Sequence, residues 1–403
     1  MRSPTRLLSG VQVLDLTNVL AGPFCTYQLA LQGADVLKVE MPVSGDLARQ
    51  LGADPALNHR GTGSSFLAQN AGKRSLTLNL KDERGKAILA ELAEDADVLV
   101  ENFRPGVLAS LGFGWDELRS RNAGLVYCAI SGFGADGPMA DRPAYDQIVQ
   151  GLSGVMDVTG QRGGGPTRAG FPICDTLGGM TAAFAITAAL VRRAATGEGA
   201  HLDVSMLDSA VAGLGWAVSN WLIGGQELER MGNDNFTASP SGAFATADGL
   251  LNIAANQQGQ FVALCDAVGR PDLAIDVRFA ERADRLVNRP ALNAELTAAL
   301  AARPATEWEV LLNPLGVPAA RVLSIPEVVE LDQLEHRQLV AEVGTVPGTD
   351  RPLRVVTAGF HVDGRAARPS TAPPVLGADV DHELARLGRS SAEISRLRSE
   401  GVL

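Results

Sequence analysis

The chain has 403 residues, of which 46% are hydrophobic and 20% charged, a composition typical of an ordinary soluble globular protein. Its formal net charge of −11 argues against nucleic acid or an anionic membrane as a partner, although a local basic pocket can still bind a small anion. The four cysteines lie far apart in the sequence and the five histidines are scattered without ligand spacing, so we expect reduced thiols, a cytoplasmic location and no metal site.

The first half of the chain alternates short apolar strands with helices. Strands are predicted at 11–16, 35–40, 75–80, 97–100, 125–131 and 201–205, and helices at 22–31, 82–94, 115–121, 176–193 and 206–223. This alternation predicts an α/β fold with an open, Rossmann-like parallel sheet covered on both faces. Ligands bind such sheets beyond the carboxyl ends of the strands. The last two helices are apolar nearly throughout, which predicts that both are buried.

From residue 242 the pattern changes. A hairpin is predicted where 243–246 and 250–254 flank Ala247-Asp248-Gly249, and short helices follow at 260–268, 290–302 and 306–312. We therefore predict a large α/β domain over 1–227 and a smaller α+β domain over 228–325. A return segment, 326–403, is expected to complete the large domain.

The first strand–helix turn lacks the glycine fingerprint of dinucleotide-binding folds, since Gly22 stands alone. Glu40, at the end of the second strand, resembles a ribose-binding acid, but without the glycines a surface or capping carboxylate is the simpler interpretation. A nicotinamide enzyme is therefore disfavoured. The sequence also contains neither a phosphate-binding P-loop motif nor a G-x-S-x-G motif.

Asp175 stands just before the long apolar helix at 176–193, after a turn predicted at 172–175. The local sequence alone favours an N-cap, where helix N–H groups and the dipole stabilise a carboxylate. The alternative is a carboxylate nucleophile held in a dry site. The surroundings of Asp175 must decide between the two.

Several basic residues recur near the predicted strand ends and loops. Most are expected to be solvated surface residues, but Arg104 directly follows a strand, a placement that suits a phosphate contact. Tyr145 follows a glycine-rich loop and fits a half-buried aromatic and a ligand contact equally well. The basic residues are Lys38, Lys73, Arg74, Lys81, Arg104, Arg142 and Arg168.

Nine segments together resemble the class III CoA-transferases, the group that includes formyl-CoA transferase, carnitine CoA-transferase and α-methylacyl-CoA racemase. No single segment is decisive, but their order and spacing are specific, and the resemblance covers nearly the whole chain. The segments are 13–23, 37–40, 72–75, 96–106, 130–134, 144–150, 175–180, 197–199 and 204–208.

The resemblance implies that Asp175 is the nucleophile of a CoA transfer. By analogy it attacks an acyl-CoA thioester, carries CoA as an aspartyl thioester and passes it to a small carboxylic acid. Both kinds of intermediate hydrolyse, so the chemistry needs a site from which water is excluded. CoA enters as substrate, with no tightly bound cofactor. The implied CoA contacts are Leu20, Ala21, Leu78, Lys81, Asn102, Phe103, Arg104, Arg142 and Tyr145.

The chain departs from the formyl-CoA transferase pattern at several positions. Asn18 and Leu20 replace a histidine and a glutamine, Met41 replaces an arginine, and Ser110 replaces a basic contact. The segment 231–237 lacks the four-glycine flap, so neither formate nor oxalate is assumed as the acceptor. Arg168 suits the second carboxylate of a dicarboxylic acid such as succinate.

Two alternatives remain open. An acyl-CoA racemase of the same fold needs a histidine opposite the aspartate, and Tyr145 occupies the matching position, which disfavours racemisation. A non-catalytic CoA-binding protein would use Asp175 only as a cap. The resemblance also implies an interlocked homodimer, in which each chain forms a ring closed by its C-terminal part.

Overall fold

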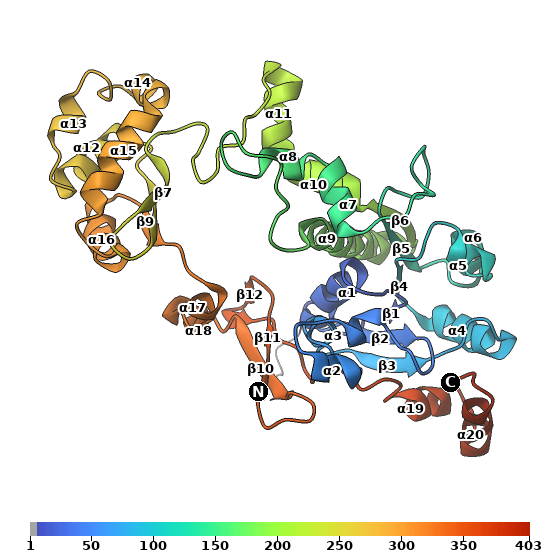
Figure 1. Ribbon diagram of the computed structural model, residues 1–403. Helices are drawn as coiled ribbons and strands as arrows, with labels where there is room; N and C mark the ends of the chain where they lie inside the picture. The colour runs from blue at the N-terminus through green and yellow to red at the C-terminus, as the bar shows by residue number, and fades with distance from the viewer. Residues whose placement is uncertain (1–5) are drawn as a thin grey trace. The chain divides into compact units, whose positions relative to one another are not determined.

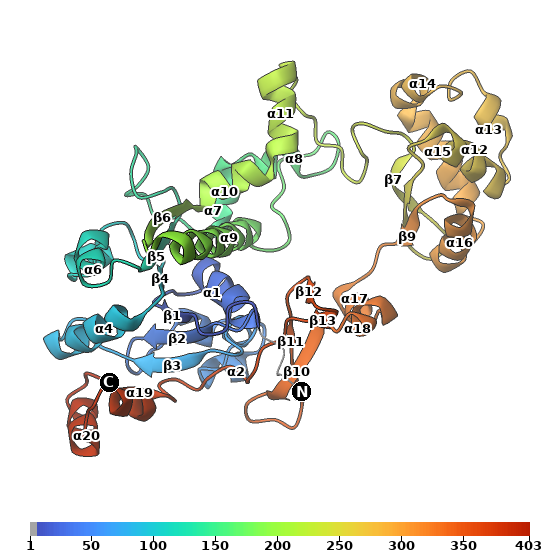
Figure 2. The same ribbon diagram turned by 180° about the vertical axis from the view of Figure 1, so that it is seen from behind.

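The computed structural model describes residues 6–403. The chain forms two compact units, which are drawn from opposite sides in Figure 1 and Figure 2. The first unit contains the residues up to 155, together with 168–226 and 332–403; the second contains 156–167 and 227–331. The C-terminal part of the chain therefore belongs to the same unit as the N-terminal part.

Six strands form one parallel sheet in the first unit. Their order is β3-β2-β1-β4-β5-β6, and every neighbouring pair is parallel, which confirms the predicted open α/β sheet. The order reverses between β1 and β4, where ligands bind in sheets of this kind. The strands are β1 (Gln12–Asp15), β2 (Asp35–Glu40), β3 (Arg74–Thr77), β4 (Val98–Glu101), β5 (Val126–Ser131) and β6 (Ala200–Ser205).

Helices cover both faces of this sheet, because alternate residues of each strand point to opposite sides. Val13 and Val36 belong to one core cluster, whereas the neighbouring Leu14 and Leu37 belong to another. The helices of the first cluster are α1 (Ala21–Leu31), α7 (Asp146–Leu152), α9 (Ile173–Thr196) and α10 (Met206–Gly213), and those of the second are α4 (Glu83–Asp95), α5 (Val107–Ser110), α6 (Trp115–Arg121), α19 (Val380–Arg386) and α20 (Ser391–Ser399).

The long helix α9 packs against α1 and the sheet through small residues. Gly179 faces the α1 backbone, and a Cβ atom there would lie 2.4 Å from the Ala21 carbonyl oxygen. Only glycine therefore permits this approach of the two helices. The length and apolar composition of α9 would also suit a membrane span, a test that buried core helices pass as well.

The predicted helix at 206–223 is two helices, α10 and α11 (Gly215–Gly224), with Leu214 between them. The glycines at 213 and 215 weaken a continuous helix at this point. The expectation that the whole segment is buried is wrong for α11, none of whose residues is buried in the chain. Apolar composition indicates that a surface avoids water, but it does not say which molecule covers it.

The C-terminal segment returns to the N-terminal part of the first unit. Ala341 and Val355 pack with Tyr27 and Leu31 of α1 in a small apolar cluster, and the Tyr27 hydroxyl donates to the Val356 carbonyl at 2.9 Å. The remaining elements of this unit are η1 (Leu47–Gln50), α2 (Pro55–His59), α3 (Ser64–Leu67), α18 (Asp332–His336), β10 (Val340–Thr345), β11 (Pro352–Val356), β12 (His361–Val362) and β13 (Arg365–Ala366).

The second unit has its own core under an antiparallel sheet of order β7-β8-β9. The predicted hairpin is present, with Phe244 opposite Leu251. The strands are β7 (Ser241–Ala245), β8 (Leu250–Ala254) and β9 (Ala319–Arg321). The helices are α12 (Gln258–Ala267), α13 (Asp272–Ile275), α14 (Arg282–Val287), α15 (Arg289–Leu300), α16 (Ala305–Leu312), η2 (Asn313–Leu315) and α17 (Ile325–Val329), and α8 (Val155–Val158) lies where the two units meet in the sequence.

Candidate functional site

A cavity of about 340 Å³ lies beyond the carboxyl ends of β1, β4 and β5. It occupies the point where the strand order reverses, which is the expected ligand position in such a sheet. Its walls come from the turn after β1, the turn after β4, the loop after β5 and the start of α9. The cavity brings together eight of the ten predicted site residues: Leu20, Ala21, Asn102, Phe103, Arg104, Arg142, Tyr145 and Asp175.

Asp175 is the third residue of α9, because the helix begins at Ile173 and Pro172 is its N-cap. The turn predicted at 172–175 is therefore too long, and Asp175 is not the cap. The capping carboxylate comes from Asp146, the first residue of α7. One oxygen of Asp146 accepts the N–H of Cys174 at 2.8 Å and that of Asp175 at 3.4 Å. Because Asp146 caps the helix, the Asp175 side chain is not needed as a cap, and it lines the cavity.

Burial and the nearby Asp146 carboxylate raise the pKa of Asp175 from its ordinary value of 3.8 to about 7. Both effects disfavour the ionised form of the carboxyl group. A carboxylate with a raised pKa holds its electrons less tightly and is a stronger nucleophile once ionised. Asp175 therefore has the perturbed acidity that is common among catalytic groups.

The neighbouring thiol of Cys174 is a poor alternative nucleophile. Its side chain is fully buried, and burial raises the pKa of Cys174 to about 11. A thiol with such a pKa stays protonated near neutral pH, whereas only the thiolate reacts readily. Of the two adjacent groups, the carboxylate is the one that faces the cavity in a reactive form.

The rim of the cavity carries exposed positive charge on a protein whose overall charge is negative. Arg104 and Arg142 line the cavity and are exposed, and Tyr145 beside them is 72% exposed. The backbone of Phe103 is held by Glu101, whose carboxylate accepts the Phe103 N–H at 2.7 Å. Burial raises the pKa of Glu101 to about 7. Guanidinium groups at the mouth of a cavity suit the phosphates of a nucleotide-like ligand.

Three residues singled out in the sequence lie outside this cavity. Leu78 is fully buried in the core cluster beneath α4, and Lys81 is exposed just before that helix. Their part in binding CoA stays a prediction. Arg168 lies 3.6 Å from the Asp146 carboxylate, with 42% of its side chain exposed. Arg168 is therefore linked to the segment of Asp175 by Asp146, which pairs with Arg168 and accepts the Asp175 N–H.

Sequence reasoning misjudged three charged residues beside the sheet. Lys38 and Lys73, expected on the surface, are buried, and Lys38 is fully enclosed. Glu40 is also buried rather than on the surface, in an ion pair with Arg49 at 2.7 Å. Sequence reasoning also assigned no role to Asp146. Its position directly after Tyr145, in a segment that carried the family resemblance, was the one available signal.

The chain matches the model of CoA-transferase family III over residues 8–380. It is 41% identical to an acetyl-CoA:oxalate CoA-transferase of Acetobacter aceti, over 87% of this chain and 90% of that protein. It is 37% identical to a succinyl-CoA:glutarate CoA-transferase of Mus musculus, over 98% of this chain and 90% of that protein. A crystal structure of a CaiB/BaiF family protein from Brucella suis covers 95% of this chain and 100% of its own, with a TM-score of 0.85 and 31% identity.

The chain therefore belongs to CoA-transferase family III, and it is a CoA-transferase. Its substrates include a CoA thioester. Within residues 6–403, no group of three or more histidine, cysteine or acidic side chains is placed to hold a metal ion.

Proposed function

We propose that this CoA-transferase passes CoA from an acyl-CoA donor to a small dicarboxylic acid, with Asp175 as the covalent carrier. The observation that carries the proposal is the half-buried Asp175 carboxylate, with its pKa raised to about 7, in a cavity rimmed by arginines. Relatives whose names specify oxalate and glutarate as acceptors support the choice of a dicarboxylic acid. Arg168, held near the site by Asp146, supports it as well.

The reaction is a sequence of four exchanges at carbonyl carbons. An Asp175 oxygen attacks the thioester carbon of the donor, the carbon–sulfur bond breaks, and CoA leaves as a thiolate. That thiolate attacks the aspartyl carbonyl carbon and releases the donor acid, which leaves an aspartyl-CoA thioester. The acceptor carboxylate then displaces the CoA thiolate to form a second anhydride. In the last step the thiolate attacks the acceptor carbonyl and restores the Asp175 carboxylate.

This scheme predicts the fate of each carboxylate oxygen. The acceptor oxygen that attacks the aspartyl carbon remains on Asp175 when the second anhydride breaks. With acceptor acid labelled by oxygen-18, Asp175 gains label during turnover. Trypsin cleaves after Arg168 and Arg192, so the label should be found by mass spectrometry in the peptide 169–192. An active enzyme with an unlabelled peptide would exclude the aspartyl carrier.

A screen of acyl-CoA donors against mono- and dicarboxylic acids tests the substrate class. Transfer to dicarboxylic acids at a kcat/KM at least about 10-fold above that for matched monocarboxylic acids is expected, since one extra charge-assisted hydrogen bond is worth roughly 1.5–3 kcal/mol. A preference for monocarboxylic acids would refute this part of the proposal. Exchange of the α-hydrogen in deuterated water without an acceptor acid would instead indicate racemisation. Tyr145 argues against that outcome, because a racemase of this fold needs a histidine there.

We also propose that the protein is a homodimer located in the cytoplasm. The free cysteines described in the structure are all buried, which supports a reducing compartment. The exposed apolar residues on α9 and α11 support a dimer, since Phe184 is 73% and Ile223 87% exposed in the single chain. Sedimentation should give twice the chain mass of 42.1 kDa. A species that stays monomeric at micromolar concentration would contradict the dimer.

A further inference from the structure

Val19, in the wall of the cavity, has a strained backbone. Its φ is +68°, in the left-handed region. A β-branched residue rarely adopts this conformation, because its branched Cβ crowds the neighbouring backbone. Such strain persists only where the surrounding structure imposes it, and it is concentrated at functional sites. The contacts that hold the turn at 17–20 therefore need an explanation.

Side chains from four different segments hold the peptide groups of this turn. The Thr17 N–H donates to Asp15 at 3.0 Å, and the Thr17 carbonyl accepts from the Lys38 ammonium at 2.7 Å. Asn102 holds both peptide groups of Asn18, accepting the N–H and donating to the carbonyl, each at 2.8 Å. The Val19 N–H donates to Asp46 at 3.0 Å. Successive peptide groups of the turn are thus fixed by nearby Asp15 and by three residues more than 20 positions away along the chain, Lys38, Asp46 and Asn102.

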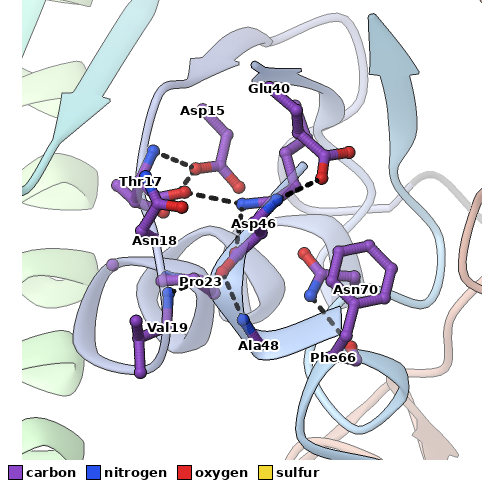
Figure 3. Close-up of polar contacts among 12 residues, drawn as sticks. Asp15, Thr17, Asn18, Val19, Pro23, Glu40, Asp46, Ala48, Phe66 and Asn70 are labelled. Carbon is purple, nitrogen blue, oxygen red and sulfur yellow. Dashed lines mark hydrogen bonds and ion pairs between the residues drawn. The ribbon is translucent and has the colours of Figure 1, made fainter. Parts of the chain in front are cut away.

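Asp46 is the side chain that binds the strained residue Val19 directly, through its N–H. The oxygen that accepts the Val19 N–H also accepts the Ala48 N–H at 2.8 Å, so Asp46 lies between these two residues (Figure 3). Its second oxygen pairs with Lys38 at 2.9 Å, and both side chains are completely shielded from solvent. The Asp46 N–H in turn donates to Glu40 at 2.9 Å.

A second buried pair continues the network. Lys73 lies 3.0 Å from the Asp15 carboxylate and also donates to Thr26 at 2.7 Å and Asn70 at 2.9 Å. Buried ion pairs seldom stabilise a fold better than apolar residues of the same size, and their best-attested use is to specify one conformation. Two such pairs converge beneath one short turn, which indicates that the geometry of this turn matters.

The turn is coupled to Asp175 through the contact between α1 and α9. Asp175 and Gly179 are four residues apart and therefore lie on the same side of α9. Gly179 meets the backbone of Ala21, which follows directly after the turn. Leu20 and Ala21 line the cavity with Asp175. A shift of the turn would therefore move the cavity wall beside the reacting carboxylate.

We propose that Asp46, paired with Lys38, is a positioning residue for CoA transfer: it holds Val19 in the left-handed conformation and thereby fixes the wall formed by Leu20 and Ala21 against Asp175. This inference rests on the proposed transfer at Asp175. Asp46 touches no substrate in this scheme. It acts through the backbone of the turn, and the pair with Lys38 fixes its own orientation.

The test combines Asp46→Asn with Val19→Gly. Glycine adopts a positive φ without strain, so the loss of Asp46 should matter less when residue 19 is glycine. We expect Asp46→Asn to lower kcat at least 10-fold in the wild-type background, with KM for acyl-CoA changed less than 3-fold. In the Val19→Gly background the same change should lower kcat less than 3-fold. Equal losses in both backgrounds would overturn the proposal.

Hydrogen exchange provides a readout that does not depend on turnover. The Val19 amide should exchange at least 10-fold faster in Asp46→Asn, and an unchanged rate would also overturn the proposal. Glu383→Gln is the matched control, since the side chain of Glu383 is 1% exposed and paired with Arg74 and Arg386. It should change neither kcat nor exchange at Val19; if it reproduces both effects of Asp46→Asn, those effects reflect general loosening and the proposal fails.

The experiment also covers a variant that does not fold and a wild-type protein that shows no CoA transfer. Should Asp46→Asn fail to fold, Asp46→Asn/Lys38→Gln, which removes both charges of the pair, takes its place under the same criteria. If the wild-type protein transfers CoA from no donor tested, the proposed function fails. The exchange measurement still decides whether Asp46 holds the turn.

Discussion

Replacing Asp175 by asparagine should stabilise the fold at alkaline pH while abolishing CoA transfer. The pKa of Asp175 is raised to about 7, chiefly by burial and further by Asp146. The folded state therefore binds the proton more tightly than the unfolded chain does. The resulting stabilisation is complete below the unfolded pKa of 3.8 and is lost as the pH rises through about 7. Above that pH, the wild-type protein bears the full cost of a charged carboxylate in the cavity.

The size of this cost follows from the shift. The pKa of Asp175 differs by about 3 units between the folded and unfolded states. At about 1.4 kcal/mol per unit, this difference gives an upper limit of about 4 kcal/mol. Asp175 is only half-buried, so solvent reduces the cost, and we expect roughly 2 kcal/mol at about pH 8. At about pH 5 the Asp175 carboxyl is protonated in the folded protein and ionised in the unfolded chain, but the pH is little more than one unit above the unfolded pKa. The advantage of Asp175→Asn should then fall below about 1 kcal/mol.

Urea unfolding at about pH 5 and about pH 8, at one fixed protein concentration, measures this difference between the wild-type protein and Asp175→Asn. Transfer activity should fall on the order of 1,000-fold or more, as when other nucleophiles are removed. The exposed Asp136 provides a control, because Asp136→Asn should give no pH-dependent change. A capping role for Asp175 requires the opposite sign, a loss of about 1 kcal/mol. An asparagine variant that is less stable than the wild type at both pH values would refute the reasoning.

Three further changes test other parts of the site. The kcat/KM for acyl-CoA should rise with pH around 7 as Asp175 ionises. Asp146→Asn should shift that rise to lower pH, because it removes the neighbouring negative charge. Measuring kcat/KM against pH for the wild-type protein and the variant checks both statements. Gly179→Ala should lower both the melting temperature and kcat, since its Cβ atom would lie 2.4 Å from the α1 backbone, at a cost of roughly 1–3 kcal/mol. Gly215→Ala, where nothing lies within 4 Å, is the control, and equal losses would contradict the packing argument. Arg104→Gln should raise KM for acyl-CoA roughly 10-fold through loss of a charge-assisted phosphate contact, and an unchanged KM would remove Arg104 from the binding site.

The sheet and the place of Asp175 at the start of a long apolar helix were predictable because both depend on short stretches of sequence. The strand at 35–40 and the helix at 115–121 have the predicted bounds, since each combines a clear apolar pattern with local start and stop signals. Asp175 drew attention because a charged residue opening an apolar helix conflicts with its surroundings. Such conflicts between local sequence and environment are expected at functional sites.

The features that were not predicted all depend on contacts between distant segments. Asp146 caps α9 from 28 positions earlier in the chain, so the local sequence at 172–175 could not place the first turn of that helix. Lys38 and Lys73 look like surface residues until the fold supplies buried carboxylates for them. The open face of α11 depends on what lies outside the chain. Periodicity reveals which residues avoid water, but not which partner accepts them.

Two aspartates of the first unit have opposite acidities because their neighbours differ. Asp15 is fully buried and Asp175 is half-buried, and burial alone raises the pKa of each. For Asp15 this effect is overcome by the ammonium groups of Lys38 and Lys73 and by two hydroxyl donors, so its pKa falls well below the ordinary value. Among the described residues, no cation lowers the pKa of Asp175 in this way, and the charged neighbour that affects it is the carboxylate of Asp146. Asp15 is therefore permanently charged and bound to its partners, which suits a structural anchor. The charge of Asp175 is poorly stabilised, and its side chain lines the cavity; in the transfer that we propose, attack on the thioester relieves this charge.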